Sequence, residues 1–113
     1  KAVNGSNILF LGVAYKPDID DARESPALDI MDTTQHKGGL VSYHDPYIPY
    51  VKTNEDNRFE SIELSEKTLS DADCVVITTN HSDLNMDLVK KYAKLIVDMR
   101  NMVEIKGDNI YKL

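Results

Sequence analysis

Short apolar runs alternate with amphipathic segments along the chain. Four of these runs are predicted strands, and the C-terminal residues could add a fifth: 7–14, 40–45, 74–79, 95–99 and 109–113. The first run is continuously apolar, the pattern of a strand covered on both faces. The run at residues 74–79 is rich in β-branched side chains, which favour strands. The alternation therefore predicts a sheet whose strands are separated by helices.

Three helices are predicted between the strands, over residues 26–37, 63–71 and 83–93. The first has Ser25 as its N-cap and Pro26 at its first position, and it ends before two glycines. Ser82 is the expected N-cap of the third. Residues 47–60 contain proline, asparagine and scattered charge, and we interpret them as a surface loop.

Strands and helices in this order indicate right-handed crossovers between parallel strands. We expect an α/β fold of the doubly wound, Rossmann-like kind: a three-layer sandwich with a mostly parallel sheet and helices on both faces. The chain has 113 residues, of which 42% are hydrophobic, which is enough to bury one core. Residues 1–113 are therefore predicted to form a single domain.

In such sheets, ligands bind beyond the carboxyl ends of the strands, near the point where the strand order reverses. The residues in these positions are Tyr15, Lys16, His44, Asp45, Asn80, His81, Arg100 and Asn101. The net charge of -6 argues against a diffuse basic surface for nucleic acid or acidic lipid. An anionic ligand must then be bound by a few placed cations, for which Lys16 and Arg100 are the candidates.

The loop after the first strand is strongly charged. Lys16 follows the strand and Arg23 precedes the helix N-cap, and the loop also contains four acidic residues, Asp18, Asp20, Asp21 and Glu24. A lysine and an arginine beside a helix N-terminus suit a phosphate group. The alternative is that both cations only offset the acidic residues of a solvated loop, and composition leaves both interpretations open.

Other motifs are absent or weak. The chain has no GxGxxG for a dinucleotide and no GxxxxGK[ST] for a P-loop, so Asp45 after the second strand is a weak indication of a ribose-binding acid. His36, His44 and His81 have no thiolate partner at metal-ligand spacing, which argues against a zinc site. As single histidines at strand ends, His44 and His81 are more often hydrogen-bonded structural groups than site residues.

The single cysteine, Cys74, cannot form an internal disulfide and lies in an apolar run, where a thiol usually packs as a small hydrophobe. This favours a reducing, cytoplasmic setting. No apolar stretch reaches membrane-spanning length, and the N-terminus lacks the apolar region of a signal peptide. We therefore expect neither a membrane partner nor a nucleic-acid partner.

Four segments, in order along nearly the whole chain, read FLGVAYKPDIDDARESPALDIM, GGLVSYHDPYIP, DADCVVITTNH and VDMRN. Together they closely resemble the C-terminal, UDP-binding domain of the UDP-glucose/GDP-mannose dehydrogenase family. The core pattern, G-x-A-Y/F-K followed by D-x-R-E-S-P, is too long for chance agreement. The residues of these segments are most similar to those of the enzymes that oxidise UDP-N-acetylglucosamine or UDP-N-acetylmannosamine.

The resemblance implies an NAD-dependent oxidation of C6 of a UDP-sugar from alcohol to carboxylate, which supplies precursors of polysaccharides. It implies an enzyme of three parts, in a homodimer or higher oligomer: an N-terminal NAD domain, a central dimerisation region and this domain, which closes over the UDP-sugar. By the same resemblance, Tyr15, Lys16 and Arg100 contact the UDP-sugar. Arg23 would reach the NAD that is bound to the other domain.

Two sequence motifs that the family's enzymes use for catalysis and for NAD binding are missing from this sequence. It has no G-G-H-C element, in which the family carries its catalytic cysteine, and no NAD-binding GxGxxG; Cys74 follows Asp73 and is not the nucleophile's counterpart. We therefore expect a domain excised from a three-part dehydrogenase, which binds UDP-sugar without catalysis.

Two alternatives to a dehydrogenase domain stay open. One is a free-standing nucleotide-sugar-binding module with a regulatory role. The other is a flavodoxin-type domain such as a response regulator, which would need a phosphorylatable aspartate at the end of the third strand. That strand ends in Thr78, Thr79 and Asn80, which argues against the second alternative.

Overall fold

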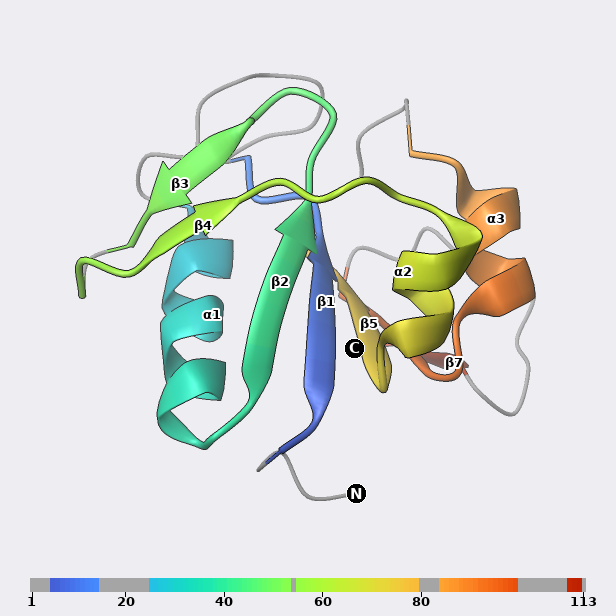
Figure 1. Ribbon diagram of the computed structural model, residues 1–113, viewed down its shortest axis with the longest axis horizontal. Helices are drawn as coiled ribbons and strands as arrows, with labels where there is room; N and C mark the ends of the chain where they lie inside the picture. The colour runs from blue at the N-terminus through green and yellow to red at the C-terminus, as the bar shows by residue number, and fades with distance from the viewer. Residues whose placement is uncertain (1–4, 15–24, 54, 80–83, 100–109, 113) are drawn as a thin grey trace.

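The computed structural model describes residues 5–14, 25–53, 55–79, 84–99 and 110–112. Within these residues, five strands form one parallel sheet in the order β2-β1-β5-β6-β7 (Figure 1). The strands are β1 Asn7–Leu11, β2 Leu40–His44, β5 Cys74–Ile77, β6 Ile96–Asp98 and β7 Ile110–Lys112. The predicted parallel sheet is confirmed, together with its fifth strand.

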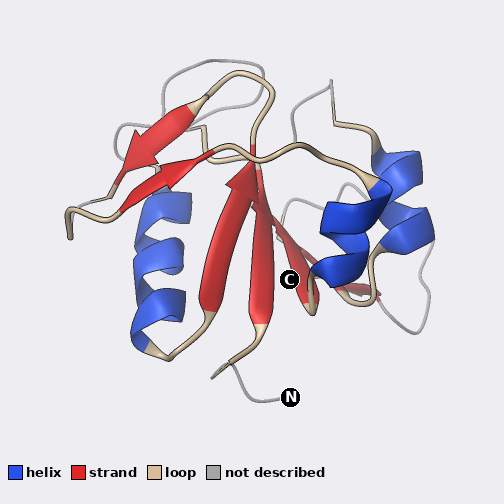
Figure 2. Ribbon diagram, in the orientation of Figure 1, coloured by secondary structure: helices blue, strands red, loops and turns tan. Residues whose placement is uncertain are grey.

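The helices lie on both faces of this sheet (Figure 2). Helix α1, Pro26–His36, covers one face, and α2, Glu66–Asp71, packs beside α3, Met86–Tyr92, on the other. The expected three-layer sandwich is therefore confirmed. None of the helices in the described ranges has the length and hydropathy needed to cross a bilayer.

Strand β1 separates two hydrophobic cores. Leu9 and Leu11 belong to the core on the side of α2 and α3, whereas Ile8 and Phe10 belong to the core on the side of α1. All four side chains are buried. This alternation explains why β1 reads as a continuous apolar run, because each face of the strand must be apolar.

Part of the segment that we interpreted as a loop forms a β-hairpin, so that interpretation was wrong there. Strands β3, Tyr50–Lys52, and β4, Arg58–Glu60, pair antiparallel. Val51 and Phe59 lie opposite each other in this ribbon and pack on the α1 side of the sheet. Each strand has three residues and one inward apolar side chain, which is too short for an alternating pattern to stand out.

Two helices begin later than the sequence predicts. Helix α2 starts after Ser65, which forms a capping box with Thr68. Helix α3 starts after Asn85, and the expected cap Ser82 lies outside the described residues. Serine and asparagine are both good N-caps, so composition alone could not decide which of them begins the helix.

The strand order reverses at β1. From β1 the chain passes through α1 to β2 on one side, and β5, β6 and β7 extend the sheet on the other. This order also occurs in flavodoxin-type folds, so topology alone does not exclude that alternative. In either fold, ligands bind beyond the carboxyl ends of the strands at this reversal.

Gly12 brings the ends of β1 and β5 into backbone contact. Its φ is +83°, and a Cβ at this position would lie 2.5 Å from the backbone oxygen of Thr79 and 2.6 Å from the Thr79 Cβ. No side chain fits in that space, and the positive φ itself favours glycine. The chain therefore leaves β1 directly against the residues that follow β5.

Gly12→Ala is expected to destabilise the fold more than Gly5→Ala does. Gly5 also has a positive φ of +81°, but nothing lies within 4 Å of a Cβ built there. The backbone conformation alone should cost about 1 kcal/mol at either glycine. The steric clash should add about 1–3 kcal/mol at Gly12. Urea unfolding of both variants measures the difference, and equal losses would contradict the close approach.

Candidate functional site

The exits of β1 and β5 are joined by two threonine hydroxyls at the carboxyl edge of the sheet. Thr78 Oγ1 donates to the carbonyl of Gly12, and Thr79 Oγ1 donates to the carbonyl of Ala14 at 2.8 Å. Both threonines are buried. A buried carbonyl that lost its donor would be costly, so these hydroxyls fix the path of residues 12–14.

The start of α1 is fastened to the same place. Ser25 Oγ donates to the Ala14 carbonyl at 3.4 Å and also accepts the Ala27 N–H at 3.3 Å, which confirms Ser25 as the N-cap. The Ala14 carbonyl thus accepts hydrogen bonds from a hydroxyl that follows β5 and from the N-cap hydroxyl of α1. Ala14 and Ser25, which flank residues 15–24 in the sequence, therefore belong to a single hydrogen-bonded cluster.

A cavity of about 240 Å³ lies beside this cluster, under the first turn of α1. It is lined by Ser25, Pro26, Ala27, Ile30, Thr78 and Met99. Met99 follows β6 and is anchored there because its N–H donates to the Ile77 carbonyl at 3.1 Å. The cavity therefore lies where the ends of β5 and β6 meet the helix N-terminus.

The first amides of α1 are already bonded within the cap. Pro26 has no N–H, the Ala27 N–H donates to Ser25 Oγ, and the Leu28 N–H donates to the Ser25 carbonyl at 3.2 Å. The helix dipole still favours an anion nearby. These amides, however, do not offer the direct phosphate cradle of a glycine-rich turn. An anion in this cavity would depend on cationic side chains.

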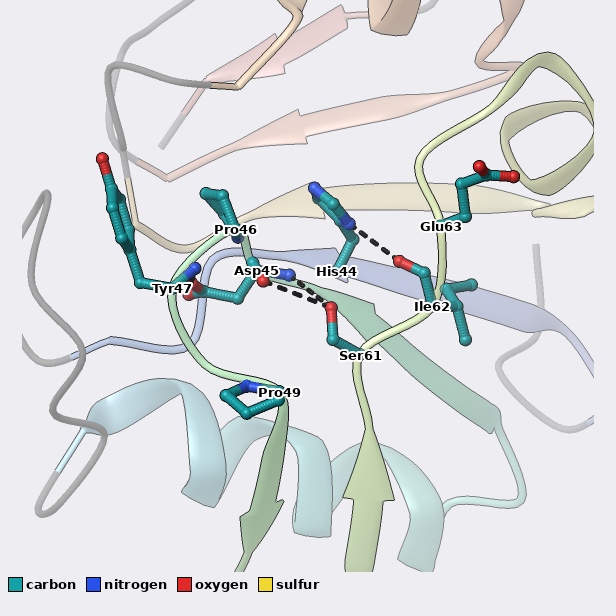
Figure 3. Close-up of a pocket in the computed structure, with 8 residues that line it drawn as sticks. All are labelled: His44, Asp45, Pro46, Tyr47, Pro49, Ser61, Ile62 and Glu63. Atoms are coloured by element: carbon teal, nitrogen blue, oxygen red, sulfur yellow. Dashed lines mark hydrogen bonds between the residues drawn. The ribbon is translucent and has the colours of Figure 1, made fainter.

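A second cavity, of about 560 Å³, lies beside the end of β2 (Figure 3). Its buried acid is Asp45, whose carboxylate accepts the N–H groups of Val13 at 2.8 Å, Tyr47 at 2.8 Å and Ile48 at 3.2 Å. The Asp45 main chain also exchanges hydrogen bonds with Ser61 Oγ, at 3.0 and 3.3 Å. Asp45 therefore fastens β1, β2 and the hairpin together.

Two neighbours of Asp45 have structural hydrogen bonds as well. His44 Nδ1 donates to the Ile62 carbonyl at 2.7 Å, which matches the expectation for a single histidine at a strand end (Figure 3). The Tyr43 hydroxyl donates to the Ile48 carbonyl at 3.0 Å. Burial raises the pKa of the Tyr43 phenol, and the charge of Asp45 raises it further. Tyr43 therefore stays neutral and acts as a hydrogen-bond donor.

The four binding residues predicted from the sequence, Tyr15, Lys16, Arg23 and Arg100, lie outside the described residues, as do Asn80, His81 and Asn101. Their described chain neighbours do meet, since Ala14 and Ser25 share a hydrogen bond and Ser25 and Met99 line one cavity. No lysine or arginine is among the described residues that line either cavity at this edge. Cys74 begins β5, at the opposite end of the strand, and packs against the core on the α1 side.

Sequence reasoning missed the hydroxyl groups that hold this edge together. From the sequence, Thr78 and Thr79 mark the end of a strand, and two hydroxyl side chains after an apolar run also indicate hydrogen bonds to neighbouring carbonyls. Nothing in the sequence indicates a comparable role for Ser61, because it follows β4, which has no apolar pattern of its own.

Comparison with known proteins gives a consistent assignment. The UDP-binding domain model of the UDP-glucose/GDP-mannose dehydrogenase family matches residues 9–105. A UDP-glucose 6-dehydrogenase from Rickettsia bellii is 31% identical over 96% of this chain and 26% of its own length. A UDP-N-acetyl-D-mannosamine dehydrogenase from Pyrococcus horikoshii is 33% identical over 86% of this chain and 22% of its own length.

A solved structure has the same fold. The crystal structure of an NDP-N-acetyl-D-galactosaminuronic acid dehydrogenase from Methanosarcina mazei superposes with a TM-score of 0.77 and 30% identity, over 100% of this chain and 25% of that chain. The chain thus spans about a quarter of the length of the relatives it matches. From the extent of the family match and these identities, the chain belongs to the UDP-glucose/GDP-mannose dehydrogenase family, as its UDP-binding domain.

Proposed function

We propose that this chain is the nucleotide-sugar-binding domain of an NAD-dependent UDP-sugar 6-dehydrogenase. In this role it holds the UDP part of the substrate while other parts of the enzyme oxidise the sugar C6 alcohol to a carboxylate. The chain itself binds and does not catalyse. The single observation that supports this role is the cavity where α1 meets the ends of β5 and β6, next to the exit of β1.

The positions of the described neighbours support Lys16 and Arg100 as the residues that bind the phosphates. Lys16 comes two residues after Ala14, and Arg100 comes directly after Met99, a cavity residue. Because the first amides of α1 are bonded within the cap, the phosphate charge must be met by these side chains. Tyr15, between Ala14 and Lys16, would line the same site.

NAD does not fit the described residues as a primary ligand. The turn after β1 lacks the glycine fingerprint of a dinucleotide site. Asp45, in the position of a ribose-binding acid, is occupied by three backbone N–H groups. We therefore propose that NAD binds mainly to another domain of the enzyme. Arg23 would reach the cofactor from this chain.

The sugar is not selected by this domain alone. The matched relatives are named for UDP-glucose, UDP-N-acetyl-D-mannosamine and an NDP-N-acetyl-D-galactosaminuronic acid, at similar identities. A shared nucleotide-binding domain with different sugars is expected if the sugar pocket is completed by other domains. A free-standing nucleotide-sugar-binding module is the second candidate, and it differs only in lacking those domains.

The chain should bind UDP, and Lys16→Ala and Arg100→Ala should each weaken that binding by roughly 1.5–3 kcal/mol, the value of a hydrogen bond to a charged group. Arg58→Ala is the matched control, because Arg58 lies on the exposed hairpin strand β4 and lines neither cavity. NMR shift titration with UDP measures both affinity and location. Shifts centred away from Ala14, Ser25 and Met99, or equal losses in all three variants, would contradict the proposed site.

In the complete enzyme, the two site arginines should affect different ligands. Arg100→Ala should mainly raise the Michaelis constant for the UDP-sugar, and Arg23→Ala should mainly raise that for NAD. If Arg23 instead pairs with acidic residues of its own loop, its loss should impair both ligands and lower the melting temperature. Steady-state kinetics with each substrate varied in turn, together with thermal unfolding, distinguish these outcomes.

A further inference from the structure

We propose that Thr79 is a positioning residue for phosphate binding, because its hydroxyl fixes the peptide group from which the segment carrying Tyr15 and Lys16 begins. The proposal rests on the proposed function, since it concerns the same UDP site. It assigns a binding role to a side chain that need not touch the ligand.

The geometry centres on the Ala14 carbonyl. This carbonyl belongs to the planar peptide unit that joins Ala14 to Tyr15, so its orientation also sets the direction in which the chain continues. Thr79 Oγ1 donates to it at 2.8 Å, and Ser25 Oγ donates at 3.4 Å. The shorter and better of the two hydrogen bonds comes from Thr79.

The donor itself is held rigidly. Thr79 is only 2% exposed, and its N–H donates to the Leu11 carbonyl at 3.3 Å. The Thr79 backbone also lies against Gly12, where no Cβ could fit. The Thr79 hydroxyl is therefore held by the chain that follows β5, and this chain is packed against the end of β1.

The consequence for binding follows from the length of the connection. Lys16 is two residues beyond the fixed carbonyl in the sequence, and no lysine or arginine is among the described residues that line the cavity. The part of the phosphate interaction that Lys16 makes depends on how narrowly its side chain is held, because ordering it costs conformational entropy. Without the Thr79 hydroxyl, the Ala14 carbonyl would keep only the longer bond from Ser25, and the segment would begin from a less restricted peptide group.

The test compares UDP dissociation constants, measured by NMR titration of the 113-residue chain and of its variants. Thr79→Val keeps the shape of the side chain and removes the hydroxyl, and it should weaken UDP binding about tenfold. Thr79→Ser restores the donor and should bind within twofold of the wild type. Where Thr79→Val does not fold, Thr79→Ala removes the same hydroxyl without a branched side chain.

Thr53→Val is the matched control. Thr53 is also a buried threonine, 4% exposed, whose hydroxyl oxygen accepts a backbone N–H at 3.2 Å, but it lies in the turn of the hairpin and lines neither cavity at the carboxyl edge. It should lower stability without changing UDP affinity by more than twofold. A similar affinity loss in Thr53→Val would show that general destabilisation explains the effect.

The proposal is overturned if Thr79→Val binds UDP as the wild type does, or if Thr79→Ser binds as poorly as Thr79→Val. These results differ from a failure of the proposed function, in which the wild-type chain itself would not bind UDP. The Lys16→Ala variant distinguishes a wrong role for Thr79 from a wrong UDP site. If Lys16→Ala weakens UDP binding and Thr79→Val does not, the proposed UDP site is supported and the proposed role of Thr79 is wrong.

Discussion

The contact between Gly12 and the Thr79 backbone is the constraint on which the carboxyl edge of the sheet depends. It brings the exits of two neighbouring parallel strands closer than any side chain would allow. The hydroxyls of Thr78 and Thr79 can then reach the carbonyls of Gly12 and Ala14. Ser25 completes the same cluster from α1, so that strand ends and helix start share one set of hydrogen bonds.

These bonds also explain how a fold of the dinucleotide-binding type can be adapted to another ligand. In a dinucleotide site, a glycine-rich turn exposes amides to the pyrophosphate and an acid after the second strand binds a ribose. Here Ser25 takes up the corresponding amides of α1, and Asp45 is bonded to three backbone N–H groups. These described backbone groups are satisfied internally, so under the proposed function recognition is left to side chains.

Much of this fold could be predicted from the sequence because its core strands carry apolar residues on both faces. The β1 run and the Ser25-Pro26 start of α1 are strong local signals, and the structure confirms both. The β3–β4 hairpin is not evident from the sequence, because Val51 and Phe59 are the inward apolar residues of its two short strands and the core on which they pack is formed by residues distant in the sequence. The candidate site was predicted by its place at the strand ends, whereas the hydroxyl bonds that shape it depend on which strands become neighbours.

The charge of the chain limits how strongly such a site can bind on its own. The net charge is -6, and four acidic residues occur in the same sequence segment, residues 15–24, as Lys16 and Arg23. Under the proposed function, the UDP phosphates must compete with these carboxylates for Lys16, and the net negative charge of the chain opposes their approach. Under the proposed function, modest affinity in the isolated domain is therefore an expected property. Contacts from the other domains would supply the remaining affinity, and they would do so only when the enzyme closes over a complete nucleotide sugar.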